Sequence, residues 1–204
     1  LDLGLGPFSN SIGSDGNLLY VLRGSFDTTF VFESIDPVDS TVTPITLSAD
    51  PIGEAGALTW NGTSFYVVDS GQTFAPGFQL YTLTTGGVLT TIGSTGQALK
   101  GLAVIGGVLY AVSPRDANLY TVDTTTAALT NTGAITSPSG MVTQANGLTI
   151  DPVSGTVYVL IRLSGSQTRQ LATLDVATRV ATVIGPVETD PATGVRAVGL
   201  AWLA

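Results

Sequence analysis

Residues 101–130 read GLAVIGGVLYAVSPRDANLYTVDTTTAALT. This stretch holds four short apolar runs, and the first two are joined by Gly106-Gly107, a pair that favours a tight hairpin turn. The runs are rich in Val, Thr, Leu and Tyr, and no 3.6-residue apolar period continues through them. We therefore expect four short antiparallel strands here, and almost no helix in the chain.

The order of runs in this stretch occurs four times along the chain. Its marker is a tyrosine in the second run, which recurs at spacings of 46, 44 and 48 residues as Tyr20, Tyr66, Tyr110 and Tyr158. Four repeats of four short strands predict an all-β domain, a β-propeller of four blades with four antiparallel strands each. We expect the tyrosines to pack between blades; the alternative is a stacking platform for bases or sugars.

The two ends of the chain decide how such a ring closes. Residues 198–202 (VGLAW) repeat the inner-strand pattern of residues 101–104 (GLAV), whereas residues 9–12 (SNSI) match it poorly. We therefore expect the C-terminal strand, residues 198–203, to pair beside Leu18–Leu22 and to close the ring by completing blade one. The alternative is an open arc that pairs with a second copy into an eight-bladed ring, because exposed sheet edges tend to find partners.

If the C-terminal strand completes blade one, that blade does not need the first residues of the chain. We therefore divide the chain into an N-terminal strand-like extension, residues 1–12, and a single propeller domain, residues 13–204. Leu1, Leu3 and Leu5 alternate with Asp and Gly, which is the pattern of a half-buried strand. Such a strand either caps an edge of its own propeller or adds to a sheet edge of a neighbouring copy.

The repeated pattern is Gly-Leu-Ala/Thr, then an apolar run centred on Tyr, then Leu-Tyr-Thr, an apolar residue and Asp. It resembles the blades of NHL/YVTN-type propellers of bacterial and archaeal extracellular proteins. The resemblance covers nearly the whole chain. It implies propeller architecture and an extracellular origin, but no particular activity, because propellers host many unrelated functions.

Composition narrows the classes of function. The formal net charge of −8 disfavours a nucleic-acid partner, and no apolar run is long enough to span a membrane. The chain has no Cys and no His, which excludes thiolate and His-ligated metal sites and His-dependent nucleophilic catalysis, and we expect no cofactor. Low charge, abundant Thr, Ser and Gly, and a first residue other than Met favour a processed, secreted or cell-surface protein.

Short polar side chains open several of the predicted turns. Asp36, Asp123 and Asp175 hold equivalent positions, where a short carboxylate accepts backbone N–H bonds from residues further along the turn. Calcium is the alternative, and Asp36 with Asp39 is its candidate site. The one N-glycosylation sequon, at Asn61, is better interpreted as an Asn-Gly hairpin turn.

The two faces of the predicted disc differ in loop length and in charge. The first-to-second and third-to-fourth turns are short and carry Asp15, Asp36, Asp39, Asp123, Asp151 and Asp175. The other face has longer loops, and its segments carry nearly all the cations, a candidate interaction face of Arg23, Lys100, Arg115, Arg162, Arg169 and Arg196. These charges are either solvated turn residues or complementary faces that steer copies or a partner together.

These features favour a non-enzymatic extracellular or cell-surface propeller with a structural or interaction role. Self-assembly, head to tail into a filament or oligomer, is one form of that role, with Leu1, Leu3 and Leu5 as assembly residues. The partner is then another copy, a surface protein or a glycan. The alternative is a binding module that takes a glycan or small molecule at the long-loop face, with Trp60 and Trp202 as its aromatics.

An enzyme is the third hypothesis. A glycosidase needs a pair of carboxylates. The chain has three glutamates, Glu33, Glu54 and Glu188. We expect Glu33, in the middle of a strand, to form a surface salt bridge instead.

Overall fold

The computed structural model describes residues 10–24, 29–51, 53–69, 78–187 and 200–202. In chain order its strands are β1 (Asn10–Ser14), β2 (Leu19–Arg23), β3 (Val31–Ile35), β4 (Val42–Ile45), β5 (Ala55–Trp60), β6 (Phe65–Asp69), β7 (Gln79–Leu83), β8 (Leu89–Ser94), β9 (Gly101–Ile105), β10 (Val108–Val112), β11 (Asn118–Val122), β12 (Leu129–Ala134), β13 (Val142–Ile150), β14 (Val157–Leu163), β15 (Gln170–Asp175) and β16 (Val180–Pro186). The described ranges contain no helix, and hence none that could cross a membrane.

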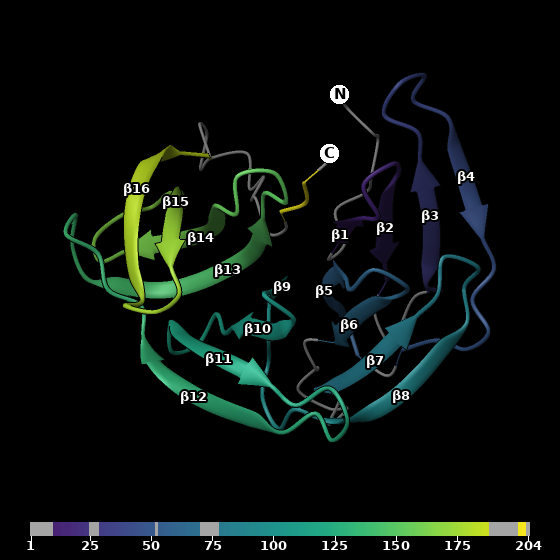
Figure 1. Ribbon diagram of the computed structural model, residues 1–204, viewed down its shortest axis with the longest axis horizontal. Helices are drawn as coiled ribbons and strands as arrows, with labels where there is room; N and C mark the ends of the chain where they lie inside the picture. Colours follow the sequence, from purple (N-terminus) through teal and green to yellow (C-terminus); the bar gives the residue numbers. More distant parts are fainter. Residues whose placement is uncertain (1–9, 25–28, 52, 70–77, 188–199, 203–204) are drawn as a thin grey trace.

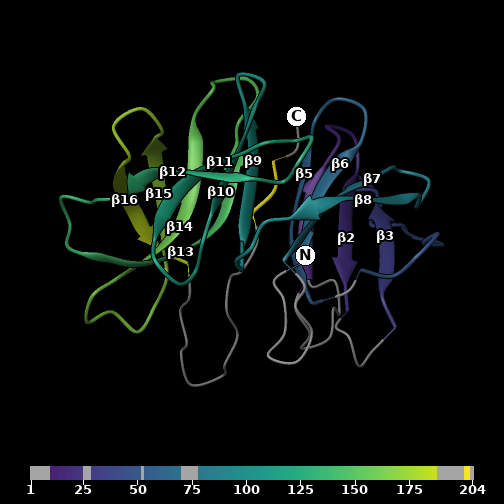
Figure 2. The ribbon, with the colours of Figure 1, turned by 90° about the horizontal axis from the view of Figure 1, so that it is seen from below.

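The strands form four sheets, each of four antiparallel strands in chain order: β1 to β4, β5 to β8, β9 to β12 and β13 to β16. Figure 1 shows these sheets following one another around a central axis, with β1, β5, β9 and β13 innermost and β4, β8, β12 and β16 outermost. Figure 2 shows the same arrangement from the side. The predicted all-β propeller of four four-stranded blades is confirmed.

Side-chain caps end the strands at the short turns. Asp123 Oδ1 accepts hydrogen bonds from the backbone N–H groups of Thr125 (2.7 Å) and Thr126 (3.1 Å). Equivalent bonds reach Asp36 from Val38 (2.8 Å) and Asp175 from Ala177 (2.9 Å). These carboxylates fix the turn backbone in the way that Asp does in an Asx-turn, as predicted.

Asn61 caps its turn in the same way. Its side-chain oxygen accepts hydrogen bonds from the N–H groups of Thr63 (3.0 Å) and Ser64 (2.9 Å). Gly62, which lies between Asn61 and Thr63, has a φ of 102°, a conformation that glycine adopts at little cost. The turn interpretation of Asn61 is confirmed, and glycosylation there stays a prediction.

The hydrophobic core lies between the blades. Tyr20 and Leu22 of blade one pack with Phe65 and Val67 of blade two in one buried cluster. A second cluster joins blades two and three, and a third joins blades three and four. The repeat tyrosines belong to these contacts, because Tyr20 is 4% exposed and Tyr66 and Tyr110 pack against the second and third clusters. Packing between blades, as predicted for these three tyrosines, is confirmed.

The predicted pairing of residues 198–203 beside Leu18–Leu22 is wrong. Strand β1 holds that place, in register from Asn10 opposite Arg23 to Ser14 opposite Leu19, and β3 lines the other edge of β2. The sequence NSIGS is poorly apolar, but the ladder to β2 satisfies the backbone groups that face β2, and Ser11 is 1% exposed. Leu200, Ala201 and Trp202 lie instead between blade four and blade one, and they are not in a strand (Figure 1).

Of the predicted N-terminal extension, residues 1–12, the structure describes residues 10–12. Strand β1 begins at Asn10, so residues 10–12 belong to the first blade rather than to an extension that ends at residue 12. Leu1, Leu3 and Leu5 lie outside the described residues.

Candidate functional site

A ring of apolar side chains from the inner strands lines the central axis. Within each blade these side chains hold one position, opposite the residue that follows the repeat tyrosine. They are Ile12, Leu58, Leu102 and Leu148. Three of them, together with Leu200, form the floor of a cavity of ≈ 310 Å³.

The cavity opens at the short-turn end of the axis. Asp15 and Gly16 of the β1–β2 turn and Pro152 of the β13–β14 turn contribute to its wall. The hydroxyl-bearing side chains of Thr59 and Thr149 also line it, from the ends of β5 and β13. Its surface therefore combines an apolar floor with hydroxyl groups at the rim, the usual composition of a small-molecule site.

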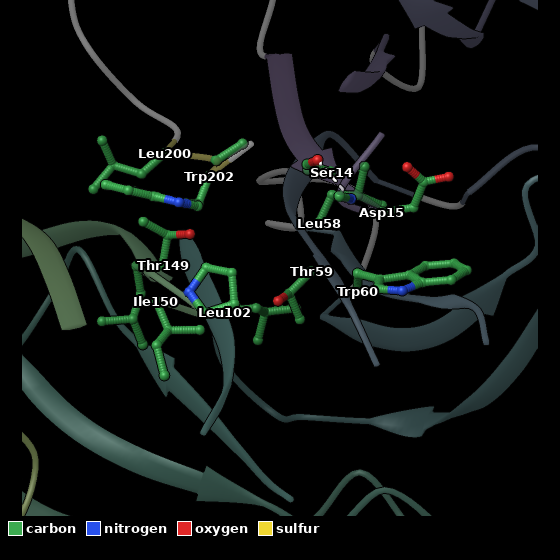
Figure 3. Close-up of a pocket in the computed structure, with 15 residues that line it drawn as sticks. Ser14, Asp15, Leu58, Thr59, Trp60, Leu102, Thr149, Ile150, Leu200 and Trp202 are labelled. Atoms are coloured by element: carbon green, nitrogen blue, oxygen red, sulfur yellow. Dashed lines mark hydrogen bonds between the residues drawn. The ribbon is translucent and has the colours of Figure 1, made fainter. Parts of the chain in front are cut away.

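Both tryptophans of the chain lie at this cavity. Figure 3 shows Trp60 and Trp202 on opposite sides, with Thr59 between them and Thr149 beside Trp202. The Trp60 ring centroid is 4.8 Å from that of Phe65, in a tilted contact, whereas Trp202 stacks on Tyr158 at 5.7 Å with 10° between the ring planes.

The predicted placement of a tryptophan-lined site at the long-loop face is wrong. Each inner strand runs toward its short turn, so Trp60, the last residue of β5, lies at the short-turn end. Trp202 ends the same sequence pattern and lines the same cavity.

Asp15 is the one titratable side chain among the described residues that line the cavity. Its Oδ1 accepts hydrogen bonds from the N–H groups of Asn17 and Leu18, both at 2.9 Å, and its Oδ2 accepts one from the Tyr20 hydroxyl at 3.1 Å. Burial, with the negative charge of Asp15 beside it, raises the pKa of Tyr20 to about 12. Both oxygens of the carboxylate are thus engaged in holding the turn and the tyrosine.

The other end of the axis is ionic. Lys100 Nζ lies 3.8 Å from Glu54 Oε2. Burial and the nearby charge of Arg169 lower the pKa of Lys100, while Glu54 opposes this shift. Ser11 and Lys100 line a void of ≈ 10 Å³, which is about the size that one water molecule needs. The two ends of the axis therefore differ in chemistry, apolar and hydroxylated at one and charged at the other.

The described cations of the candidate interaction face make contacts within the chain. Arg23 Nη2 donates to both carboxylate oxygens of Glu33, at 3.1 Å to Oε1 and 2.9 Å to Oε2, which confirms the predicted salt bridge of Glu33. The Arg115 guanidinium lies 5.9 Å above the Phe78 ring, and Arg162 Nε donates to the Ser166 carbonyl at 3.0 Å. Arg196 and Glu188 lie outside the described residues. A partner for this face stays a prediction.

The carboxylates of Asp36 and Asp39, the candidate calcium site, already accept hydrogen bonds from the backbone. Asp39 Oδ1 accepts the Thr41 N–H at 2.8 Å, and hydrogen bonds from Thr41 lower the pKa of Asp39. In the part of the chain that the structure describes, no three His, Cys, Asp or Glu side chains gather where they would hold a metal ion.

Sequence reasoning singled out the tryptophans but missed Thr59, Thr149 and the leucines of the floor. A signal was present, because Leu58, Leu102, Leu148 and Leu200 occur at one place in the repeated Gly/Ala-Leu pattern. The pattern indicates where the inner strands lie. Which side of each strand faces the axis depends in addition on how the neighbouring blades pack against it.

Comparisons with known proteins identify the fold. No family model matches the chain, and no curated protein is significantly similar to it in sequence. Among solved structures, glutaminyl cyclase of Myxococcus xanthus has a TM-score of 0.52 at 19% identity, over 84% of this chain and 76% of its own. A GH43B protein of Bacteroides ovatus, named for xyloglucan, has a TM-score of 0.58 at 14% identity, over 80% of this chain and 38% of its own.

A third similar structure is an auxiliary nutrient binding protein of Bacteroides thetaiotaomicron. Its TM-score is 0.54 at 18% identity, over 88% of this chain and 43% of its own. The chain thus spans less than half of the length of the two Bacteroides proteins. Identities this low show the propeller fold alone. The NHL/YVTN resemblance stays an expectation.

Proposed function

We propose that this chain is a non-enzymatic binding propeller that takes a neutral, hydroxylated ligand in the cavity at the short-turn end. The observation that carries the proposal is the cavity of ≈ 310 Å³ between Trp60 and Trp202, with an apolar floor. Among the described residues of its wall, Asp15 alone is titratable, and its carboxylate already accepts three hydrogen bonds. Acid–base turnover needs a second positioned group, so binding is the better account of this site.

A saccharide suits the surface of this cavity. Indole faces pack against the C–H face of a sugar ring, while threonine hydroxyls and backbone groups bond its hydroxyls. The net charge of −8 disfavours an anionic ligand. The xyloglucan name of one similar protein and the nutrient-binding name of another support the choice of a saccharide.

An extracellular or cell-surface location belongs to the same proposal. Its support is the low charge, the abundance of Thr and Ser, and the resemblance of the repeats to NHL/YVTN-type extracellular propellers. A neutral glycan is a ligand that such a location supplies.

Intrinsic fluorescence provides the test, because the two tryptophans of the chain both line the cavity. We expect at least one member of a panel of neutral oligosaccharides to change the emission saturably. Thr149→Val should weaken that binding by about 5-fold to 10-fold, the effect of removing one or two hydrogen bonds. Thr91→Val, an exposed substitution on β8, is the matched control and should leave it unchanged.

Two results would count against the proposal. If no saccharide in the panel changed the tryptophan emission, the ligand would not be a saccharide of this kind. If the protein hydrolysed a bound glycoside, it would be an enzyme.

Self-assembly is a second candidate because outer strands expose apolar side chains beside their free edges. Val42 of β4 is 45% exposed and Ile184 of β16 is 58% exposed. Within the described residues β4 pairs along one edge only, and β16 has, besides its ladder to β15, a single bridge from Val180 to Thr136. An added strand from Leu1, Leu3 and Leu5 of a neighbouring copy would cover such an edge.

Sedimentation tests this second candidate. The full chain should form larger species than a chain without residues 1–8 at matched salt. Equal sedimentation of both as monomers would remove self-assembly from consideration.

A further inference from the structure

The chain contains two Asn-Gly pairs, Asn61-Gly62 and Asn146-Gly147, and the fold places them in different surroundings. We infer that Asn61 is a site of spontaneous modification, where the side-chain amide is converted to aspartate or isoaspartate, and that the fold protects Asn146 from the same reaction. The two pairs differ in their exposure, in their hydrogen bonds and in the packing around the glycine.

The reaction needs the two residues and water. The backbone nitrogen of the glycine loses its proton to the solvent and attacks Cγ of the asparagine side chain. A C–N bond forms, the Cγ–Nδ2 bond breaks, and Nδ2 takes up a proton from the solvent and leaves as ammonia, so that a cyclic succinimide remains. Water then adds to one of the two ring carbonyl carbons and opens the ring. Opening on one side gives aspartate and on the other side isoaspartate.

The turn at Asn61 leaves the attacking nitrogen free. Gly62 and Thr63 are exposed, and a Cβ atom placed on Gly62 would meet nothing within 4 Å. Among the described residues the Gly62 N–H has no hydrogen-bond partner. Solvent base can therefore reach this N–H without any opening of the fold.

The cap of the same turn supplies donors to the reacting carbonyl. Asn61 Oδ1 accepts the N–H groups of Thr63 at 3.0 Å and Ser64 at 2.9 Å, and the Thr63 hydroxyl at 3.1 Å. Attack at Cγ places a negative charge on this oxygen, and donors already aimed at it stabilise that charge. The Asn61 amide nitrogen, which must leave, has one long hydrogen bond, to Ser64 Oγ at 3.4 Å.

Asn131, in β12, has a similar cap but no glycine after it. It is exposed, and its Oδ1 accepts the Gly133 N–H at 2.8 Å. The residue that follows is Thr132, whose β-branched side chain crowds the backbone nitrogen and restricts its approach to Cγ. Gly62 has no side chain and reaches backbone conformations that threonine disfavours. Asn131 therefore isolates the effect of the glycine.

Asn146 has the glycine but not the exposure. It is 3% exposed and lies in the inner strand β13. A Cβ atom placed on Gly147 would lie 3.1 Å from the Leu160 side chain and 3.2 Å from that of Leu200. Closing the ring would require the backbone to rotate against these neighbours. We therefore expect this pair to react only in molecules in which the blade has opened.

Conversion of Asn61 changes the wall of the cavity. Aspartate keeps an oxygen for the cap and adds a negative charge. Isoaspartate routes the backbone through Cγ, which lengthens the turn by one carbon directly after Trp60 and removes the cap. Trp60 lines the cavity and packs on Phe65 at 4.8 Å, so isoaspartate should displace its ring. This displacement does not depend on whether the cavity binds a saccharide.

Peptide mass mapping of the full chain, sampled over time at mildly alkaline pH, tests the assignment. In the folded protein Asn61 should convert at least about 10-fold faster than Asn131 or Asn146. In urea that unfolds the chain, Asn146 should convert within about 3-fold of the Asn61 rate, because both pairs are then exposed, while Asn131 stays slow.

Two variants serve as controls. Asn61→Ser keeps a capping oxygen but cannot form the ring, so its folded chain should gain no isoaspartate in an isoaspartyl methyltransferase assay. Asn61→Asp supplies the charge without the longer backbone. In a Trp202→Phe background its Trp60 emission should stay close to that of the unreacted chain, whereas the isoaspartate form should differ.

Three results would overturn the inference. The first is a folded chain in which Asn61 converts no faster than Asn131. The second is a folded chain in which Asn146 converts as fast as Asn61. The third is a glycan on Asn61 in protein from its natural source, because the amide nitrogen then cannot leave as ammonia.

Discussion

The interface between blades one and two and the contact between blade four and Trp202 use one repeat position in different ways. Tyr20 is 4% exposed, and its ring lies 5.7 Å from that of Phe32 and 4.8 Å from that of Phe65. Tyr158 holds the same place in the repeat, yet it is half-buried and has a single aromatic partner, Trp202, among the described residues. Tyr66 and Tyr110, which face complete blades, are half-buried too, so what distinguishes Tyr20 in the repeat is its pair of aromatic partners, Phe32 and Phe65.

Truncating the two tyrosines should give the largest difference. Tyr20→Ala removes an enclosed aromatic ring and should cost about 3–5 kcal/mol of unfolding free energy. Tyr158→Ala removes a half-buried ring with one stacking partner and should cost about 1–2 kcal/mol. Urea denaturation at neutral pH measures both, with Thr91→Val as the surface control. Equal losses would show that blade four is covered as completely as blade one.

Adding a methyl group at the two inner-strand glycines gives the next effect. A Cβ at Gly101 would lie 2.7 Å from a backbone N and 2.9 Å from a backbone C, so Gly101→Ala should cost about 1–3 kcal/mol. At Gly147 the contacts are 3.1 Å or longer, to Leu160 and Leu200, and we expect less than about 1 kcal/mol. Thermal unfolding of both variants measures the two losses of stability. A larger loss for Gly147→Ala than for Gly101→Ala would contradict this prediction.

Alkaline pH should weaken the enclosed interface selectively. The pKa of Tyr20 rises from 10.0 to about 12 because of burial and the Asp15 charge. The folded state therefore disfavours the phenolate, so the stability is fully present below pH 10 and is lost as the pH rises from 10 toward 12. Tyr20→Phe keeps the ring and should lose less stability across that range. Parallel pH profiles for parent and variant would contradict the assigned pKa.

Quenching of the two tryptophans should show the smallest effect. Trp202 is 36% exposed, whereas Trp60 is partly buried against Phe65. Iodide should quench the emission of Trp60→Phe, which reports Trp202, more strongly than that of Trp202→Phe. The reverse order in Stern–Volmer plots would mean that Trp202 is covered in solution.

The blades were predictable because strand periodicity and turn chemistry are local. Asp123 and Asn61 cap turns through bonds to residues two or three positions away, so the sequence around them contains the whole signal. Strand β1 was missed because its sequence, NSIGS, has one apolar side chain, and its pairing is set by β2 and β5 instead. The cavity was missed because it is built from residues of several blades and Trp202, whose meeting depends on the curvature of the ring.

The close Gly–Leu approach between successive inner strands has a consequence for how such chains grow. The close approach of β13 to β9 recurs, with longer contacts, between Leu200 and β13. Successive inner strands therefore meet through similar surfaces. If a segment of one blade's length were duplicated or deleted, the inner strands at its two ends would pack against neighbours of the same kind, so little new packing would be needed. Gene duplication can then change the number of blades in one step, and the bore at the centre widens or narrows with each unit gained or lost.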